Sequence, residues 1–498
     1  MNLENNLLKY ISFEAKKLAL RHHAYHNAIA LENNRKKGRL KNPKLLDIEK
    51  PEHWASDKKF NPFYVHKNAD SIAKSITRKI LSGEYKPFDP VVAKIRKKSG
   101  GTRDVEKYQI PDAAVSTFFY HRLLKKNRHR FSSFSYAYRN DRNVHFAIQD
   151  IAVELSQSSR IFVAEFDFSK FFDSIDHEYL FSQFDKNGFY ISKEERTVIK
   201  AFLSNREQGI PQGTSISLFL ANLACWKLDK QFEREGLQFA RYADDTVIWS
   251  RDYTKISRAF DIITEFSNDA GVSINMDKSE GISLLCDEKM PSEFASRKSQ
   301  VEFLGYAISA NNVSIKDASI TKIKKQISYI LYKHLLQPLN NSPLKALKIP
   351  SNDRDDALLS AMCEIRRYLY GNLNDDMITT YLSGRSHRIF FKGIMSFYPI
   401  INNEDQLRDL DGWLVTNIYT TMKKRGHMLA SHRLPCWHTK PFSLNKKEFV
   451  EYCDTNRIKK KRLLKIPSFM KIYHAIKKGL IESGVSGITS PMADSYEY

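Results

Sequence analysis

Residues 241–250, "RYADDTVIWS", place two adjacent carboxylates, Asp244 and Asp245, directly before an apolar run. The wider segment "QFARYADDTVIWSRD" is typical of two β-strands joined by a tight turn that contains the pair. Neighbouring negative charges beside a hydrophobic strand repel each other and are costly to desolvate. The sequence therefore predicts a turn that needs compensating positive charge.

A third carboxylate stands near the end of another apolar segment. "RIFVAEFDF", residues 160–168, is a predicted strand, and Asp167 is its next-to-last residue. Two divalent metals about 3.5 to 4 Å apart can hold the attacking and leaving oxygens of a phosphoryl transfer, and carboxylates must ligate them. Asp is common in turns, so the Asp244–Asp245 pair alone is weak evidence. If Asp167 approaches the pair from its own strand, the bound cations would neutralise the cluster.

Helical and strand-like patterns divide the chain and predict an α+β fold. Residues 1 to about 80 are mainly helical and basic, with "NNRKKGRLKN" (33–42) as an expected exposed loop. Strands and helices mix from about 85 to 310, where "HEYLFSQFDKNGF" is an expected helix. Beyond 320 the chain is helical again, and an apolar stripe there predicts a helix packed on a core with lysines facing outward. The stripe consists of Ile323, Ile327, Ile330 and Leu331.

The overall charge is strongly positive. The chain has 79 Lys and Arg against 57 Asp and Glu, a formal net charge of +22 with a pI near 9.5. Such an excess favours a polyanionic partner. Aromatic residues, 12% of the chain and spread through the basic segments, favour nucleic acid over an anionic membrane, which is the competing interpretation. His22, His23 and His26 have helical spacing that would suit a metal, but without a nearby acidic or cysteine ligand a solvated or RNA-facing helix face is favoured.

Length, cysteines and hydropathy indicate a globular cytoplasmic protein. The 498 residues, 42% hydrophobic and 27% charged, are enough for two or three domains. The five cysteines stand far apart without a C-x-x-C pair, which argues against a zinc or redox site and suits a reducing compartment. No stretch reaches the roughly 18 apolar residues of a membrane span. We therefore expect no membrane partner.

Several ordered motifs resemble those of the reverse transcriptases. "FDFSKFFDSIDH" (166–177) is similar to the first catalytic motif, "GIPQGTSISLFLANL" (209–223) to the template- and nucleotide-binding motif, and "YADD" (242–245) to the metal-binding turn. "INMDKSE" (274–280) and "FLGY" (303–306) are similar to the two motifs that follow. Their order and spacing together make coincidence an inadequate explanation.

The resemblance extends upstream and implies a right-hand polymerase fold with fingers, a palm built on an antiparallel sheet, and a thumb. "KKSGGTR" (97–103), "IPD" (110–112) and "SYAYRNDRN" (135–143) resemble the fingers. The chain is then divided into four expected regions. These are a helical basic region (1–80), fingers and palm (81–315), a helical thumb or maturase-like region (316–430) and a basic C-terminal region with a flexible tail (431–498).

The resemblance and the strand pattern agree on the metal ligands. Asp167, Asp244 and Asp245, with the main-chain carbonyl of Phe168, are expected to hold two Mg²⁺ ions, or Mn²⁺ in their place. The family further implies that Lys278 protonates the pyrophosphate leaving group.

Nucleotide contacts are implied by position in the motifs. Lys97, Lys98 and Arg103 around Gly100-Gly101 form an expected basic hairpin for the triphosphate, although such a run taken alone is usually a solvated turn. Phe172 lies where the family places a gate against the ribose 2′-hydroxyl, which implies deoxynucleotides; a core aromatic is the alternative.

The Gly-Pro turn contributes two more expected contacts. The Gln212 amide can hydrogen-bond the nascent base pair, and Gly213 leaves room for close backbone approach. Tyr242 and Gly305 of "FLGY" would support the primer terminus. Asp173 and Asp176 are interpreted as structural residues that begin or cap the following helix.

The C-terminal third is expected to contact RNA. In "RIKKKRLLK" (457–465), cations would meet phosphates while nearby Tyr and Trp meet unpaired bases; a generic basic surface is the alternative. The cations proposed for this contact are Lys459, Lys460, Lys461 and Arg462. The expected partners are a structured non-coding RNA as template and scaffold, the cDNA product and dNTP substrates, and a homo-oligomer is compatible with the sequence. In the acidic tail, Tyr496 and Tyr498 could prime synthesis, with a disordered end as the alternative.

Within the family the motifs look most like the bacterial group II intron lineage. The upstream segment "HWASDKKFNPFYVHKNADSIAKSITRKI" is more like the reverse transcriptases associated with phage defence, of the abortive-infection and unknown-group types. No Cys/His endonuclease cluster follows residue 430, which weakens a mobile-intron interpretation. The alternatives that stay open are a maturase or retron-type enzyme and an RNA-binding protein with a vestigial polymerase.

Overall fold

The chain forms two compact units, each described here by itself. The computed structural model describes residues 2–96, 102–279, 281–287, 289–292, 294–340, 355–386, 389–432, 439–458 and 460–488. Among these, residues 2–26 and 48–300 make up the first unit, and residues 27–47 and 301–488 make up the second.

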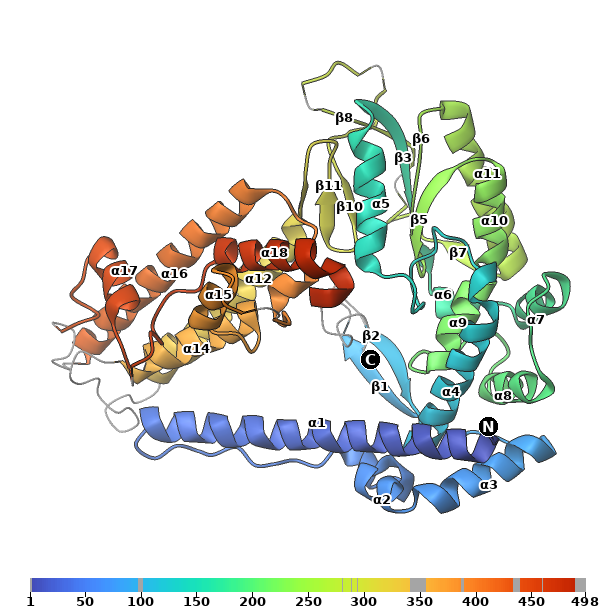
Figure 1. Cartoon of the computed structure of the whole chain (residues 1–498), viewed down its shortest axis with the longest axis horizontal. Coiled ribbons are helices and arrows are strands. Elements are labelled where there is room, and N and C mark those ends of the chain that lie inside the picture. The colour runs from blue at the N-terminus through green and yellow to red at the C-terminus, as the bar shows by residue number, and fades with distance from the viewer. Residues whose placement is uncertain are drawn as a thin grey trace. The chain divides into compact units, whose positions relative to one another are not determined.

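The N-terminal part is helical, as predicted, but one expected loop is wrong. Helix α1 (Leu3–Arg39) continues through most of the segment 33–42 (Figure 1). Lys and Arg are good helix formers, and a single Gly38 close to the helix end costs little. Asn33 then hydrogen-bonds both backbone groups of Leu46, which fixes the returning chain to the helix.

The first unit contains a five-stranded sheet in the order β5-β6-β3-β8-β9. Its neighbouring strands are antiparallel except for the pair β8 and β9. The strands are β3 (Arg160–Phe166), β5 (Gln238–Tyr242), β6 (Asp245–Ser250), β8 (Ser283–Cys286) and β9 (Arg297–Lys298). Two short antiparallel pairs lie beside it, β1 (Val91–Arg96) with β2 (Thr102–Lys107) and β4 (Phe168–Ser169) with β7 (Ser273–Ile274).

Helices cover this sheet and form one core with it. Helix α5 (Val144–Ser156) packs against β5, and α11 (Tyr253–Ala270) packs against β3 and β6 (Figure 1). Helix α4 (Ile110–Asn127) packs along α9 (Ser215–Ala224). The other helices of the unit are α2 (Pro62–Lys67), α3 (Ala69–Ser82), α6 (Phe171–Ser174), α7 (His177–Lys186), α8 (Lys193–Leu203) and α10 (Trp226–Arg234), with short 3₁₀ turns at Glu52–Trp54, Lys58–Phe60 and Arg128–Arg130.

Polar residues begin these helices where the sequence indicates. Asp176 accepts a hydrogen bond from the Tyr179 amide at 2.7 Å and caps α7, which confirms its predicted structural role. Ser192 and Glu195 form a capping box on α8. Helix α11 begins at the cap Asp252 and ends at Gly271, which adopts φ +69°.

The second unit combines a small sheet with a helical bundle. The sheet has the antiparallel order β10-β11-β12, formed by Val301–Phe303, Tyr306–Ile308 and Val313–Ile315. The helices are α12 (Asp317–Leu331), α14 (Asp356–Tyr370), α15 (Asp375–Leu382), α16 (Glu404–Ser431), α17 (Lys446–Thr455) and α18 (Phe469–Ile488), with a π-helical stretch at Tyr332–Leu336 and 3₁₀ turns at Gln337–Leu339 and Ile394–Phe397. All four residues of the predicted apolar stripe on α12 are buried, so this prediction is confirmed.

Mixed helix and sheet agree with the predicted α+β class. The division into four functional regions stays a prediction. No helix in the described part of the chain is long and apolar enough to cross a membrane. Cys225, Cys286, Cys363 and Cys453 are free thiols, and Cys436 lies outside the described residues.

Candidate active site

Strand register brings the predicted carboxylates to one end of the sheet. Phe166 of β3 pairs with Thr246 of β6, so Asp167 and Asp245 follow at the same end of two neighbouring strands. Tyr242 pairs with Asp245 in the β5–β6 hairpin, which leaves Ala243 and Asp244 as the two turn residues. The predicted pair of strands with a tight turn is therefore confirmed.

The turn has an unusual backbone conformation. Ala243 adopts φ +61°, in the left-handed region that residues other than glycine seldom occupy. For an L-residue this conformation costs roughly 1–2 kcal/mol. The surrounding structure must supply contacts that hold the turn in place.

Arg241 supplies such a contact from within the core. Its guanidinium donates to the Ala243 carbonyl at 2.9 Å, and its Nε and Nη2 donate to the two carboxylate oxygens of Asp229 at 2.6 and 2.7 Å. Nη2 also donates to the Ser135 hydroxyl and Nη1 to the Asn222 side chain. Both side chains of the Arg241–Asp229 pair are fully buried.

Burial and pairing act against each other in this ion pair. Burial raises the pKa of Asp229, while burial alone would lower the pKa of Arg241 and the Asp229 carboxylate raises it above its usual value. Bidentate hydrogen bonds favour the charged form of both groups. Arg241 therefore neutralises Asp229 rather than the carboxylates of the turn, a role that the sequence interpretation missed.

Lys278 provides positive charge at Asp167. Its Nζ lies 2.8 Å from Oδ2 of Asp167, and the Asn275 amide donates to the same oxygen at 2.9 Å. The hydrogen bond with Asp167 raises the pKa of Lys278 above its usual value. The Lys278 side chain is still 60% exposed, so it is free to change rotamer when another cation approaches.

Asp244 is electrostatically coupled to the same group of charges. Burial raises the pKa of the Asp244 carboxyl, and the negative charge of Asp167 raises it further. Arg103 and Lys278 oppose this rise. The coupling shows that Asp244 and Asp167 share one electrostatic environment, as the sequence predicted.

The donors at this edge fit hard divalent cations in chemistry. Carboxylate oxygens are the ligands that Mg²⁺ and Mn²⁺ take in proteins, and the mutual repulsion of Asp167 and Asp244 is what a bound cation would relieve. Within the described residues, however, no three His, Cys, Asp or Glu side chains converge into a ready-made metal cluster. Lys278 occupies one oxygen of Asp167 instead. The phenyl ring of Phe168 is buried, so only its main chain is a candidate ligand.

The Gly-Pro turn is fastened to its neighbours by backbone contacts. The Glu106 amide of β2 donates to the Gln212 carbonyl at 2.8 Å. A Cβ at Gly213, where φ is +113°, would lie 2.4 Å from the Glu106 carbonyl. The room predicted at Gly213 is therefore used by strand β2. The Gln212 side chain donates to Asp173 at 3.1 Å, and the Ile210 amide donates to the Phe172 carbonyl at 2.6 Å.

Phe172 belongs to a row of aromatic rings beside the carboxylates. Tyr138 lies between Phe172 and Tyr242, with ring centroids 6.5 Å from each. Phe172 is half-buried, whereas the Tyr242 side chain is 7% exposed. The partial exposure of Phe172 is consistent with a surface position near a substrate, and the primer contact of Tyr242 stays a prediction.

The basic hairpin forms as predicted. Strands β1 and β2 pair from Val91–Lys107 to Arg96–Thr102, and Arg103 is exposed on β2. Lys97 and Lys98 lie outside the described residues. Arg103 therefore remains the hairpin cation whose influence on Asp244 is visible.

Gly305 lies in a tight turn of the second unit. Leu304 and Gly305 join β10 to β11 with φ +49° and +88°, the two positive values that a type I′ hairpin requires. The Gly305 carbonyl accepts a hydrogen bond from the Lys316 amide. The primer contact of this turn stays a prediction.

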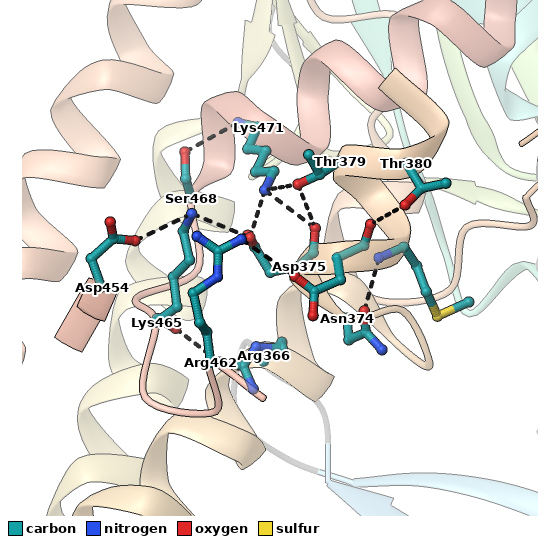
Figure 2. Close-up of polar contacts among 12 residues, drawn as sticks. Arg366, Asn374, Asp375, Thr379, Thr380, Asp454, Arg462, Lys465, Ser468 and Lys471 are labelled. Atoms are coloured by element: carbon teal, nitrogen blue, oxygen red, sulfur yellow. Dashed lines mark hydrogen bonds and ion pairs between the residues drawn. The ribbon is translucent and has the colours of Figure 1, made fainter. Parts of the chain in front are cut away.

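The predicted RNA-binding cations lie on an anchored loop of the second unit. Asp375 holds two lysines at its base, with 2.7 Å to the Lys471 ammonium and 3.3 Å to Lys465 (Figure 2). Burial would raise the pKa of Asp375, but the two lysines outweigh it and lower the pKa below its usual value. Arg366 donates to the carbonyls of Leu463 and Lys465, which fixes the strand that follows the loop.

The loop itself presents cations to solvent. Ile458 and Lys461 exchange two backbone hydrogen bonds, and Lys460 adopts φ +66° between them. Lys460 and Lys461 are exposed, while Arg462 lies 3.4 Å from Asp376. Lys459, Tyr496 and Tyr498 lie outside the described residues, so their expected roles stay predictions.

The three histidines of α1 have aromatic neighbours. His22 lies 5.0 Å from the Trp54 ring and His23 lies 5.8 Å from Phe63, between ring centroids. The sequence interpretation found no partner for these rings, because Trp54 and Phe63 are distant along the chain.

Comparison with known proteins adds a family assignment for part of the chain. Residues 95–308 match the family described as reverse transcriptase (RNA-dependent DNA polymerase). The chain is 27% identical over 176 residues to the retron Ec86 reverse transcriptase of Escherichia coli, covering 34% of this chain and 49% of that protein. The match thus spans about half the length of this curated relative.

Solved structures of telomerase also match, at low similarity. Apo telomerase from Candida tropicalis gives a TM-score of 0.37 at 12% identity, covering 95% of this chain and 70% of that one. Telomerase from Candida albicans in complex with a fragment of telomeric RNA gives 0.35 at 12% identity, covering 80% of this chain and 70% of that one. Scores at this level support no inference about function.

Proposed function

We propose that the chain, whose residues 95–308 form a reverse transcriptase domain of right-hand polymerase fold, is an RNA-directed DNA polymerase. The observation that carries the proposal is the placement of Asp167, Asp244 and Asp245 at one end of two paired strands within that domain. Similarity to the retron reverse transcriptase supports the same activity.

Asp167, Asp244 and Asp245, with the Phe168 carbonyl, would hold two divalent metals, Mg²⁺ or Mn²⁺. When bound, such ions neutralise the triphosphate and lower the pKa of the attacking 3′-hydroxyl. The protein contributes a fixed turn, because Arg241 holds the Ala243 carbonyl next to Asp244. Lys278 would leave Asp167 and donate a proton to the departing pyrophosphate, a role supported by its exposure and its raised pKa.

Substrate selection would depend on the groups around the turn. Phe172 would exclude a ribose 2′-hydroxyl by its bulk, and Arg103 would attract the triphosphate. Gln212 would orient the nascent base pair; its hydrogen bond to Asp173 supports a defined side-chain position. Tyr242 and the Gly305 turn would support the primer end.

The proposed partners are a structured non-coding RNA as template and scaffold, dNTPs and the cDNA product. The net charge of +22 and the exposed lysines of the loop at Lys460–Lys461 support a polyanionic partner. We further propose a cytoplasmic enzyme that acts in antiphage defence and can form a homo-oligomer, with Tyr496 or Tyr498 as the priming hydroxyl. Loss of DNA–protein linkage in Tyr496→Phe plus Tyr498→Phe would support tail priming, and persistence of the linkage would exclude it.

The test is to sequence nucleic acid that co-purifies with the wild-type protein and with Asp244→Ala plus Asp245→Ala. Separate RNase, DNase and protease treatments identify each component. RNA in both samples with DNA only in the wild type is the expected result. DNA in both samples, or incorporation that ignores the double substitution, would contradict the assignment of these carboxylates.

The retron similarity favours one alternative within the same chemistry. A retron-type enzyme would yield a branched RNA–DNA product, which a debranching treatment would shorten. A group II intron maturase would require a neighbouring intron whose splicing depends on the protein. A vestigial polymerase would bind RNA without metal-dependent nucleotide incorporation.

A further inference from the structure

A cluster of partly exposed aromatic rings, here called the aromatic platform, lies on the first unit. It comprises His22, His23 and Tyr25 of α1, Trp54, and Phe63 of α2. Phe63 is 44% exposed and Tyr25 is 38% exposed. Single exposed apolar residues are ordinary, but a contiguous group of large rings on a surface marks an interaction site.

The rings hold one another by their edges. The Phe63 ring lies edge-on to His22, His23 and Trp54, with centroid distances of 6.2, 5.8 and 6.1 Å and interplanar angles of 79°, 81° and 79°. Edge-to-face contacts of this kind are favourable and fix ring orientation. The backbone below is also fixed, because the Asn61 side chain accepts from the Phe63 amide and caps α2. The platform is thus a preorganised surface.

The charge around the platform is positive. Residues 16–26 of α1, "KKLALRHHAYH", contain Lys16, Lys17 and Arg21 and no acidic residue. None of these eleven positions is buried, so their composition is not set by the protein core. Arg21 precedes Tyr25 by one helical turn on α1, and Lys67 follows Phe63 by one turn on α2. Each of the two most exposed rings therefore has a cation on its own helix face.

Rings beside cations are the pattern that binds unpaired bases. Aromatic side chains stack on any base, and neighbouring cations contact the phosphates, which gives affinity for single strands with little sequence preference. A protein partner of an apolar patch would favour a surface poor in lysine. The observations therefore favour nucleic acid over protein.

We propose that the aromatic platform binds unpaired bases of a single-stranded RNA segment, as a site distinct from the polymerase carboxylates. Tyr25 and Phe63 provide the stacking faces, and Arg21 and Lys67 contact the flanking phosphates. The platform would anchor a single-stranded part of the RNA that serves the enzyme. This inference rests on the proposed function only for the identity of the RNA as template.

Binding can be measured without catalysis. The full-length protein is titrated into a fluorescein-labelled, unstructured RNA of mixed sequence, without metal or dNTP, and Kd is obtained from anisotropy at several salt concentrations. The same RNA annealed to its complement and a DNA of the same sequence are measured in parallel. The variants are Tyr25→Ala, Phe63→Ala, their combination and Phe63→Leu, with Leu20→Ala as matched control because Leu20 is 59% exposed on α1 and has no ring.

The expected result is a Kd for single-stranded RNA that is roughly 10-fold weaker for each lost ring, as for one base–aromatic stack. Phe63→Leu should lose as much as Phe63→Ala, because it keeps the apolar contact but not the stacking face. The slope of log Kd against log salt should stay unchanged in these variants, whereas Arg21→Gln or Lys67→Gln should reduce it by about 0.7. Leu20→Ala should bind as the wild type.

Two results would overturn the proposal. One is that Tyr25→Ala plus Phe63→Ala, folded by circular dichroism, binds single-stranded RNA within twofold of the wild type. The other is that duplex and single strand weaken equally, which would indicate a general loss of electrostatic attraction. Tighter binding of DNA than of RNA would reassign the site to a DNA strand, and lost self-association with unchanged RNA binding would reassign it to a second copy of the chain. Because Asp244→Ala should bind RNA normally, failure of the polymerase assignment and failure of the platform are distinguishable.

Discussion

Removing the Arg241–Asp229 pair should separate stability from catalysis. Both side chains are fully buried, so Asp229→Asn leaves the Arg241 charge without its counter-ion. Breaking a buried pair by removing one partner costs about 3–5 kcal/mol, whereas replacing both partners with apolar residues of similar volume is often neutral or stabilising. We therefore expect Asp229→Asn to lower the free energy of unfolding by about 3 kcal/mol, and Arg241→Met with Asp229→Leu to restore most of it.

Activity should not return with stability in the double variant. The charged hydrogen bond from Arg241 to the Ala243 carbonyl is lost in both variants, and bonds to charged groups contribute about 1.5–3 kcal/mol. The turn also carries the left-handed conformation at Ala243, which costs roughly 1–2 kcal/mol and favours relaxation once that bond is gone. A displacement of this size corresponds to a loss of about 10- to 100-fold in kcat, since 1.4 kcal/mol is about tenfold.

The assay pairs urea unfolding with steady-state primer extension on the same preparations. The expected pattern is a recovered unfolding midpoint, a reduced kcat and a KM for dNTP close to that of the wild type. Arg241→Lys serves as a further control, because lysine keeps the charge but cannot form the bidentate contact. A stable double variant with wild-type kcat would show that Arg241 only fills the core, and the positioning argument would be refuted.

Three further predictions concern separate parts of the first unit. Burial lowers the pKa of His145 to about 4, so this residue stays neutral in the fold while it would protonate below about 6.5 when unfolded; stability should be complete above pH 6.5 and fall by roughly 3 kcal/mol towards pH 4. His145→Gln should flatten that part of a pH series of urea unfolding, and an unchanged slope would show that other groups dominate. Gly213→Ala should separate β2 from the Gly-Pro turn, because the new Cβ would lie 2.4 Å from the Glu106 carbonyl at φ +113°; we expect a lower melting temperature and reduced primer extension, and wild-type values for both would contradict the close approach. Phe172→Ala should raise ribonucleotide incorporation relative to deoxynucleotide, measured as a ratio of kcat/KM, and no gain would argue for a purely structural ring.

Local sequence patterns were sufficient for much of this architecture. The β5–β6 hairpin, the end of β3 at Asp167 and the apolar stripe of α12 all follow from the spacing of apolar residues within one element. The cap at Asp176 follows from residue type and position. Each of these features depends on residues close together along the chain.

Contacts between distant segments could not be predicted in the same way. The approach of Glu106 to Gly213, the ion pair of Lys278 with Asp167 and the packing of His22 on Trp54 each depend on how separate elements dock. The error at residues 33–42 has another cause, since a run of cations was interpreted as a loop although Lys and Arg favour helix. A buried arginine directly before an acidic turn was the one available sign of the Arg241 contact.

The most direct test of the central claim is single-turnover extension of a DNA primer annealed to an RNA template. The wild type should add dNTPs in the presence of Mg²⁺, and Asp244→Asn, which keeps the shape of the turn residue, should reduce incorporation to background while RNA binding is retained. Equal incorporation by the two proteins, or none by a wild type that binds the primed RNA, would contradict the assignment of a polymerase active site at the β5–β6 turn.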